Sequence, residues 1–137
     1  MAQRGKGGII FLSSLVGFYG TPRFAHYAAT KAYNLILAEG LASELKSYGV
    51  SVLALAPGFT DSEYVSRLDL SRLPMKPMPA SRVVAKALRK LGHGSLAIPG
   101  AMNLTMNAMN KLLFPRALAS RMNGVIMGRV SLRKGVI

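Results

Sequence analysis

The chain has 137 residues, half of them apolar, so it is long enough to form one domain with its own core. It contains no cysteine and only two histidines, which excludes a disulfide framework and leaves too few good ligands for a zinc site. We therefore expect no bound metal. The apolar run over residues 9–12 is too short for a signal peptide or a membrane span, so we expect a cytoplasmic protein.

The charges are unevenly distributed. The net charge is +13, all five acidic residues lie between positions 39 and 69, and twelve Lys or Arg follow from position 70 onward without an acid. An acid-free basic segment of this kind, residues 70–137, would attract anionic lipid, nucleic acid or a phosphate-bearing ligand. Because the basic residues are spread out, we favour a solvated basic surface, balanced by a missing or partner segment. Aromatic and basic residues do not alternate, so we expect no nucleic-acid binding.

The first half of the chain predicts a strand, a helix and a second strand. Residues 8–14 form an apolar run that ends in small hydroxyl residues, which is typical of a buried strand. Apolar residues at helical spacing predict a helix over residues 23–47, with Gly49 at its end. Residues 50–56 predict a second strand that stops at Pro57-Gly58. This order is typical of a right-handed βαβ unit with parallel strands.

Shorter elements follow. Residues 60–68 predict a short helix or a loop, and residues 71–81, with three prolines, predict a connection. A helix is expected over residues 81–91, with Ser81 as its N-cap and Gly92 as its stop. A third strand is expected over residues 95–98, ended by Pro99-Gly100.

The C-terminal stretch, residues 101–127, is rich in Met and Leu with basic residues between them. Pro115 is expected to break it into two helices, and residues 131–137 are expected to fray. We favour helices that pack on the protein's own core or on a partner subunit. A basic amphipathic segment on a membrane surface is the open alternative. We therefore divide the chain into a catalytic segment, residues 1–100, and a basic helical extension, residues 101–137.

Ser14, Tyr27 and Lys31 have a spacing with chemical meaning. Tyr27 and Lys31 are four residues apart on the predicted helix, so they lie on one face about one turn apart. There the Lys31 ammonium would favour the phenolate of Tyr27 and lower its pKa from the usual value of about 10. Ser14, at the end of the neighbouring strand, would share the same reacting oxygen. The set predicts a proton-transfer site.

The order of these segments resembles the classical short-chain dehydrogenase/reductases, closely over residues 5–65 and loosely over residues 66–100. The fold implied by the resemblance is α/β: a partial Rossmann-like, doubly wound parallel sheet of about three strands with flanking helices. The residues that carry the resemblance are Ser14, Gly17, Tyr27, Ala29, Lys31, Ala32, Glu44, Leu45, Gly49, Val50, Val52, Pro57 and Gly58.

The resemblance also implies a function, namely an oxidoreductase that transfers hydride between NAD or NADP and a carbonyl or alcohol substrate. Tyr27 would be the general acid/base, and Lys31 would assist it and bind the nicotinamide ribose. Ser14 would hold the substrate oxygen, with Ser13 as a rival for that role. The remaining nicotinamide contacts would come from Pro57, Gly58, Thr60 and Ser62.

One part of such a site is missing. The glycine-rich turn that cradles a pyrophosphate follows a strand, whereas Gly5-Lys6-Gly7-Gly8 precedes one. We therefore expect the C-terminal half of a family member, with the N-terminal dinucleotide-binding half absent. NAD and NADP both stay open, because the residue that selects between them belongs to that half. The full-length form would be a homo-oligomer. The alternative is an inactive fragment that acts as a subunit-interaction or basic membrane-surface module.

Substrate selectivity would come from the loops over residues 15–24 and 59–79. Their apolar side chains either pack the loops or form a pocket for an apolar small-molecule carbonyl or alcohol. These side chains are Phe18, Tyr19, Phe24, Tyr64, Leu68 and Met75.

Overall fold

The computed structural model of the chain describes residues 1–71 and 76–132. At its centre lies a parallel sheet of three strands in the order β1-β2-β6. These strands are β1 (Gly7–Leu12), β2 (Val50–Leu55) and β6 (Leu96–Ala97). The predicted fold class, a partial Rossmann-like parallel α/β sheet of three strands, is confirmed.

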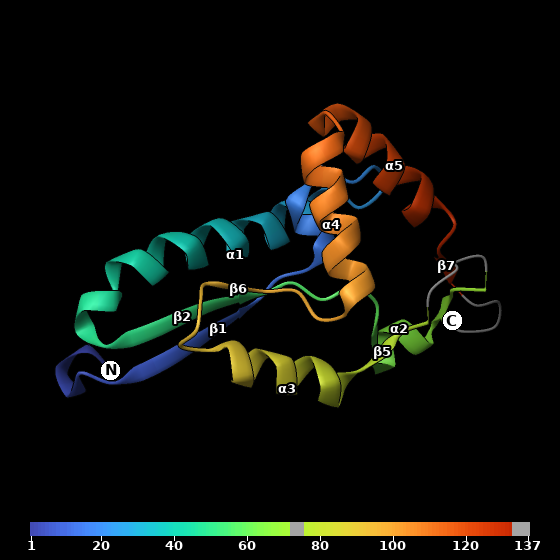
Figure 1. Cartoon of the computed structure of the whole chain (residues 1–137). Helices are drawn as coiled ribbons and strands as arrows, with labels where there is room; N and C mark the ends of the chain where they lie inside the picture. Colours follow the sequence, from blue (N-terminus) through green and yellow to red (C-terminus); the bar gives the residue numbers. More distant parts are fainter. Residues whose placement is uncertain (72–75, 133–137) are drawn as a thin grey trace.

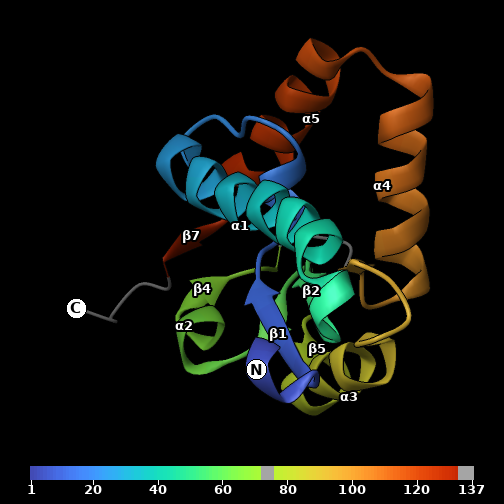
Figure 2. The ribbon, with the colours of Figure 1, turned by 90° about the vertical axis from the view of Figure 1, so that its left-hand side faces the viewer.

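One helix covers each face of the sheet (Figure 1, Figure 2): α1 (Ala25–Glu44) on one side and α3 (Ala80–Lys90) on the other. Strand β2 supplies both cores, because successive side chains of a strand point to opposite faces. Val52 and Ala54 pack against α1 at Ala38. Leu53 and Leu55 pack on the opposite face against α3, at Val83 and Ala87.

The predicted strand-helix-strand unit is present with shorter elements. Strand β1 ends at Leu12, and the expected long helix ends at Glu44, after which a 3-10 turn, η3 (Lys46–Tyr48), leads to β2. Gly49 has a φ of 67°, and a Cβ there would lie 2.0 Å from the Gly5 carbonyl oxygen. The turn into β2 therefore requires glycine at this position. Two further 3-10 turns are η1 (Ala2–Arg4) and η2 (Leu15–Phe18).

The segments after β2 form small pairs that the sequence did not predict. Strand β3 (Thr60–Asp61) pairs with β5 (Met78–Pro79), and α2 (Glu63–Ser66) lies between them. Strand β4 (Leu68–Asp69) pairs antiparallel with β7 (Ser131–Leu132). The expected fraying of residues 131–137 is therefore wrong for Ser131 and Leu132. Residues 133–137 lie outside the described part.

The expected cap of α3 is also wrong. The helix begins at Ala80 with Pro79 as its N-cap, and no side chain caps it. Ser81 thus lies in the first turn, two residues after the N-cap position, so its hydroxyl does not act as the N-cap. The expected stop is close to correct, since the helix ends at Lys90 and Gly92 has a φ of 85°.

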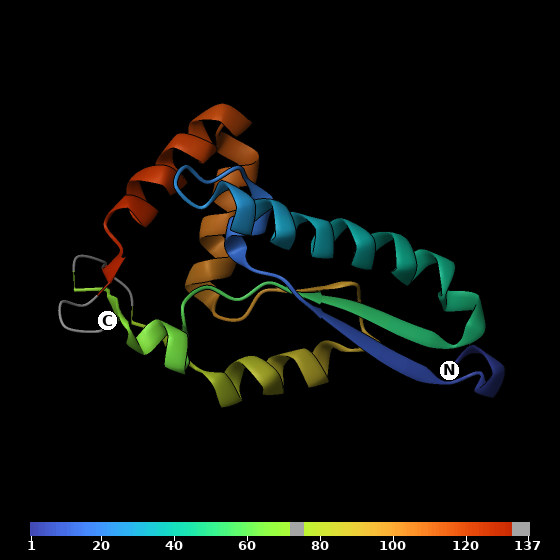
Figure 3. The ribbon, with the colours of Figure 1, turned by 180° about the vertical axis from the view of Figure 1, so that it is seen from behind.

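Pro115 separates two helices as predicted: α4 (Ala101–Leu113) and α5 (Arg116–Gly128). Both lie beyond the carboxyl ends of β1 and β2, near the start of α1 (Figure 3). Two hydrogen bonds tie α5 to the loop before α1: Arg116 Nη1 donates to the Phe18 carbonyl at 3.2 Å, and Ser120 Oγ donates to the Gly20 carbonyl at 2.6 Å. Within residues 1–71 and 76–132, no helix is long and apolar enough to cross a membrane.

Candidate functional site

The site begins where β1 ends. The backbone after Leu12 stays bound to the end of β2, since the Ser13 N–H donates to the Leu55 carbonyl at 2.7 Å and the Leu15 N–H donates to the Pro57 carbonyl at 3.0 Å. Ser14 lies between these two bonds, half-buried, and its hydroxyl makes a long bond of 3.4 Å to the same Pro57 carbonyl. Ser14 is therefore fixed in backbone position while its hydroxyl is only weakly held.

The neighbouring serine is placed differently. Ser13 is 2% exposed, and its hydroxyl donates to the Lys31 carbonyl of α1 at 2.7 Å. This short bond fastens the end of β1 to the helix that carries Lys31. The arrangement favours Ser14 over Ser13 as the serine that could reach a ligand. The catalytic role of Ser14 stays a prediction.

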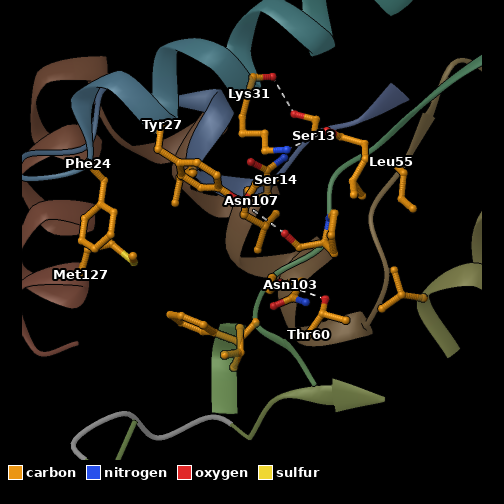
Figure 4. Close-up of a pocket in the computed structure, with 18 of the residues that line it drawn as sticks. Ser13, Ser14, Phe24, Tyr27, Lys31, Leu55, Thr60, Asn103, Asn107 and Met127 are labelled. Atoms are coloured by element: carbon orange, nitrogen blue, oxygen red, sulfur yellow. Dashed lines mark hydrogen bonds between the residues drawn. The ribbon is translucent and has the colours of Figure 1, made fainter. Parts of the chain in front are cut away.

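Tyr27 and Lys31 lie one turn apart on α1, as their spacing predicts. Lys31 Nζ donates to the Leu12 carbonyl at 3.0 Å and lies 5.5 Å from the centroid of the Tyr27 ring. Tyr27 is 45% exposed, and its hydroxyl has no hydrogen-bond partner among the residues that the structure describes. Figure 4 shows Tyr27, Lys31 and Ser14 extending toward the same region of a pocket. The three predicted residues are thus brought together.

Asn34 is a residue of this cluster that the sequence reasoning missed. Its side-chain amide donates to the Leu12 carbonyl at 3.0 Å, so it shares this acceptor with Lys31. The signal was its position three residues after Lys31, which places both side chains on one helix face.

Gly17 allows the turn η2, which follows Ser14, to lie close to the backbone of α1 at Lys31. A Cβ on Gly17 would lie 2.8 Å from the Lys31 carbonyl carbon and 3.0 Å from the Ala32 nitrogen. Only glycine allows η2 to approach the α1 backbone this closely. The close contact holds the Lys31 turn of the helix beside Ser14.

The predicted cofactor residues follow β2. Pro57 is buried, and its carbonyl accepts the bonds from Ser14 and Leu15. The Thr60 hydroxyl donates to the Gly58 carbonyl at 3.3 Å. The Ser62 hydroxyl accepts the Val65 N–H at 3.3 Å and so caps α2. Its use as a cap is a role that the sequence reasoning did not predict.

All the predicted site residues line one cavity of about 760 Å³. This volume is within the range of small-molecule sites. Its lining contains one charged side chain, Lys31, and otherwise neutral groups. The predicted residues in the lining are Ser14, Tyr27, Lys31, Pro57, Gly58, Thr60 and Ser62.

The prediction of an apolar wall is confirmed for Tyr19, Phe24, Tyr64 and Leu68, which line the same cavity. Phe18 is not part of the lining, so the prediction is wrong for this residue. Its backbone carbonyl accepts the bond from Arg116. Met75 lies outside the described residues.

The second wall of the cavity comes from α4 and α5, which the sequence reasoning did not connect with the site. Three asparagines of α4 at positions 103, 107 and 110 share one helix face with Met106 and line the cavity. Their i, i+4, i+7 spacing within a Met- and Leu-rich helix could have indicated a polar helix face that lines a pocket. Helix α5 adds Asn123, Ile126 and Met127.

A comparison with protein families gives one match that covers more than half of this chain. The model of the short chain dehydrogenase family matches residues 1–72. The curated 3-oxoacyl-(acyl-carrier-protein) reductase of Staphylococcus epidermidis is 40% identical over 84 residues, which are 60% of this chain and 34% of the relative. The corresponding reductase of Rickettsia prowazekii is 39% identical over 69 residues, 50% of this chain and 29% of that protein. The chain thus spans about a third of the length of these relatives.

Solved structures show the same similarity. A 7β-hydroxysteroid dehydrogenase superposes with a TM-score of 0.77 at 26% identity, covering 90% of this chain and 49% of that one. A short-chain dehydrogenase from Burkholderia cenocepacia in complex with NADP gives a TM-score of 0.68 at 27% identity, over 85% of this chain and 47% of that one. Because the family model matches more than half of the sequence, the chain belongs to the short chain dehydrogenase family.

Proposed function

We propose that the protein is an oxidoreductase that transfers hydride between a nicotinamide cofactor and a carbonyl or alcohol carbon. The observation that carries the proposal is the convergence of Ser14, Tyr27 and Lys31 on one cavity, beside the Pro57-Gly58 turn. The cavity lies at the carboxyl ends of parallel strands, where open α/β sheets bind their ligands.

Each of the three side chains has a part that its geometry supports. The Tyr27 hydroxyl has no hydrogen-bond partner among the described residues and would exchange a proton with the substrate oxygen. Lys31 Nζ lies beside the Tyr27 ring, so its positive charge would stabilise negative charge on the phenol oxygen. The weakly held Ser14 hydroxyl would donate to the substrate oxygen.

The residues present fit the nicotinamide end of a dinucleotide. Lys31 uses one N–H on the Leu12 carbonyl, which leaves two donors that could bind a ribose hydroxyl. Pro57, Gly58, Thr60 and Ser62 line the cavity beside it. The bound cofactor would supply or accept the hydride, and the protein would position the substrate carbon and move one proton. Both NAD and NADP stay open.

We further propose that the chain corresponds to the C-terminal half of a longer dehydrogenase. The solved relatives are about twice as long as the part that aligns, which supports this view. In the same proposal, residues 1–100 carry the catalytic segment, and residues 101–137 form an extension whose helices wall the pocket. A homo-oligomer of the full-length form is supported by Tyr33 and Ile36, two large apolar side chains that α1 leaves 65% and 70% exposed.

The structural relatives and the residues that line the cavity support a substrate class. One structural relative is a 7β-hydroxysteroid dehydrogenase, and another is an alcohol dehydrogenase from Comamonas testosteroni specific for bulky-bulky ketones. The cavity here has aromatic and aliphatic walls from Phe24, Tyr64 and Met127. We propose an apolar small-molecule ketone or secondary alcohol as the substrate.

Replacing Tyr27 with Phe tests the proposed reaction. In a form of the protein that carries the nucleotide-binding half, Tyr27→Phe should lower ketone reduction by about 100-fold or more, because it removes only the proton donor. Loss of NADPH or NADH absorbance measures the rate. Tyr27 is 45% exposed, so the melting temperature should stay within a degree or two of the parent's. Full activity in the variant would remove Tyr27 from its role.

A second candidate function is a basic membrane-surface module. The end of α4 presents Leu112 and Leu113, 80% and 63% exposed, beside the basic residue Lys111. The chain from position 70 onward holds no acidic residue. Exposed apolar side chains with positive charge favour an anionic lipid surface as the partner.

A further inference from the structure

The cavity wall that α4 and α5 form carries neutral amides. Asn103, Asn107 and Asn110 follow one another at single-turn intervals on α4, and Asn123 of α5 lines the same cavity. The cavity therefore has neutral amides on this wall, beside the apolar side chains of Met106, Ile126 and Met127.

The side-chain amide of Asn103 already has a hydrogen-bond partner within the protein. Asn103 Nδ2 donates to the Pro99 carbonyl at 2.8 Å, and its side chain packs against Gly58, where a Cβ would lie 3.0 Å away. Asn103 thus fixes the start of α4 against the turn after β2. It has a structural reason for being an asparagine.

The other three amides have no such partner. Asn107, Asn110 and Asn123 are partly buried and make no hydrogen bond with the described residues. Figure 4 shows Asn107 reaching from its helix into the pocket in which Tyr27 and Ser14 lie. A half-buried amide without a protein partner has to bind water or a ligand, because an unmade hydrogen bond is costly.

The charges of the lining limit what such a ligand can be. Lys31 is the one charged side chain among the lining residues, and it belongs to the Tyr27 end. A carboxylate or phosphate beside Asn107, Asn110 and Asn123 would lose water without gaining a counter-charge. An amide can both donate and accept, so it suits a hydroxyl or another neutral polar group.

We propose that Asn107, Asn110 and Asn123 form a specificity site for a second, uncharged hydrogen-bonding group of the substrate, remote from the reacting carbonyl. The ligand class is a neutral ketone with an apolar body and a distant hydroxyl or amide. The proposal rests on the proposed function only for the orientation of the carbonyl toward Tyr27. Binding of the distant group depends on the amides alone.

Three bicyclic ketones test the site: 4-(4-hydroxycyclohexyl)cyclohexanone, its 4-cyclohexyl analogue without the hydroxyl, and the analogue with a carboxylate in its place. Isothermal titration into the full chain without cofactor should give about 5- to 10-fold tighter binding of the hydroxy ketone than of the analogue without it. The carboxylate should bind most weakly. Equal affinities, tightest binding of the carboxylate, or no binding of any ketone would each overturn the proposal.

Substitutions of the asparagines test which residues cause the preference for the hydroxy ketone. Asn107→Leu and Asn110→Leu, which nearly conserve volume, should each reduce the preference for the hydroxy ketone toward onefold while keeping the affinity for the unsubstituted ketone. Thr105→Val is the matched control, because Thr105 lies on the same helix, is exposed and does not line the cavity. An unchanged preference in both asparagine variants would contradict the assignment. If a variant does not fold, the ranking of the three ketones by the parent chain still decides.

This experiment is independent of catalysis. Hydroxyl selectivity in a chain whose longer form shows no ketone reduction would refute the proposed reaction and retain the amide site. Ketone reduction without hydroxyl selectivity would retain the reaction and refute the amide site.

Discussion

Two adjacent serines at the end of β1 differ in how their hydroxyls are bound. Ser13 is buried and its hydroxyl is committed to the Lys31 carbonyl, whereas Ser14 keeps a hydroxyl with one long bond. A buried hydroxyl with a short bond contributes to stability, and a loosely held one can be recruited by a ligand. The pair therefore offers a direct test of which serine acts on the substrate.

Alanine at each position should separate the two roles. Ser13→Ala should lower the free energy of unfolding by about 1 kcal/mol, because it removes the bond between β1 and α1. Ser14→Ala should leave stability within about 0.5 kcal/mol and lower turnover by about 100-fold, the usual cost of losing a donor to a developing oxyanion. Urea unfolding and ketone reduction by the longer form measure the two effects. The reverse pattern would assign catalysis to Ser13.

At the residue scale the sequence was most informative where spacing carries geometry. Four residues on a helix brought Tyr27 and Lys31 to one face, as the helical period requires. The choice between Ser13 and Ser14 needed the structure, because adjacent serines are equivalent in sequence and differ only in their partners. Asn34 was missed for a related reason. Its side chain and that of Lys31 share the Leu12 carbonyl as acceptor, and Leu12 is remote from both in sequence.

At the scale of elements, the contact between η2 and α1 positions the site. Gly17 lets the turn after Ser14 approach the α1 backbone at Lys31 and Ala32. The contact joins backbone to backbone, so neither side can yield by rotating a side chain. Its geometry thus sets the distance from Ser14 to the Tyr27–Lys31 turn.

Gly17→Ala should therefore destabilise the protein by about 2 kcal/mol, as overpacking at a rigid contact does. Gly20→Ala is the matched control in the same loop, because its nearest neighbour would be Ser120 Oγ at an ordinary 3.7 Å. Thermal unfolding of both variants measures the difference. Equal melting temperatures would show that α1 can move away from η2 without cost.

Elements were predictable where apolar residues form a run, as in β2, where they recur at helical spacing, as in α1, and where a proline stops a helix, as at Pro115. The pairs β3–β5 and β4–β7 have two residues in each strand. Such short strands have no period to recognise, and their partners are distant in sequence. The role of α4 in the cavity was missed because an amphipathic stripe does not show which surface it covers.

At the scale of the whole molecule, β1 is an edge of the sheet. It pairs with β2 alone among the described strands, and a parallel sheet is normally covered and extended on both sides. In a complete dinucleotide fold the pyrophosphate contacts come from a glycine-rich turn after an earlier strand. In our proposal, the residues around the cavity would therefore hold only the nicotinamide end of a cofactor.

We expect this chain alone to bind NADH or NADPH weakly, and the form with the nucleotide-binding half to bind one of them well. Most of the affinity for a dinucleotide arises from the pyrophosphate and adenosine contacts, which residues 1–137 do not supply in our proposal. Isothermal titration of both forms with both cofactors measures it. A micromolar Kd for the chain alone, about −8 kcal/mol, would contradict the half-site interpretation.

The distribution of charge over the molecule allows a last test, of the membrane-surface candidate. Helix α3 lies across the sheet from α1, whereas α4 and α5 meet on the other side of the molecule (Figure 1). If the end of α4 and helix α5 contact lipid, charge matters there and not on α3. Each basic residue near an anionic surface contributes about 1 kcal/mol.

Lys111→Glu with Arg121→Glu should therefore weaken binding to phosphatidylserine-containing vesicles by about 10-fold or more. Arg82→Glu with Lys86→Glu makes the same change of net charge on α3 and should have little effect. Vesicle co-sedimentation at low and high salt measures both, and binding should fall as salt screens the surface. Equal losses in the two variants would indicate non-specific attraction by net charge. Absence of binding by the parent chain at low salt would eliminate the membrane-surface function.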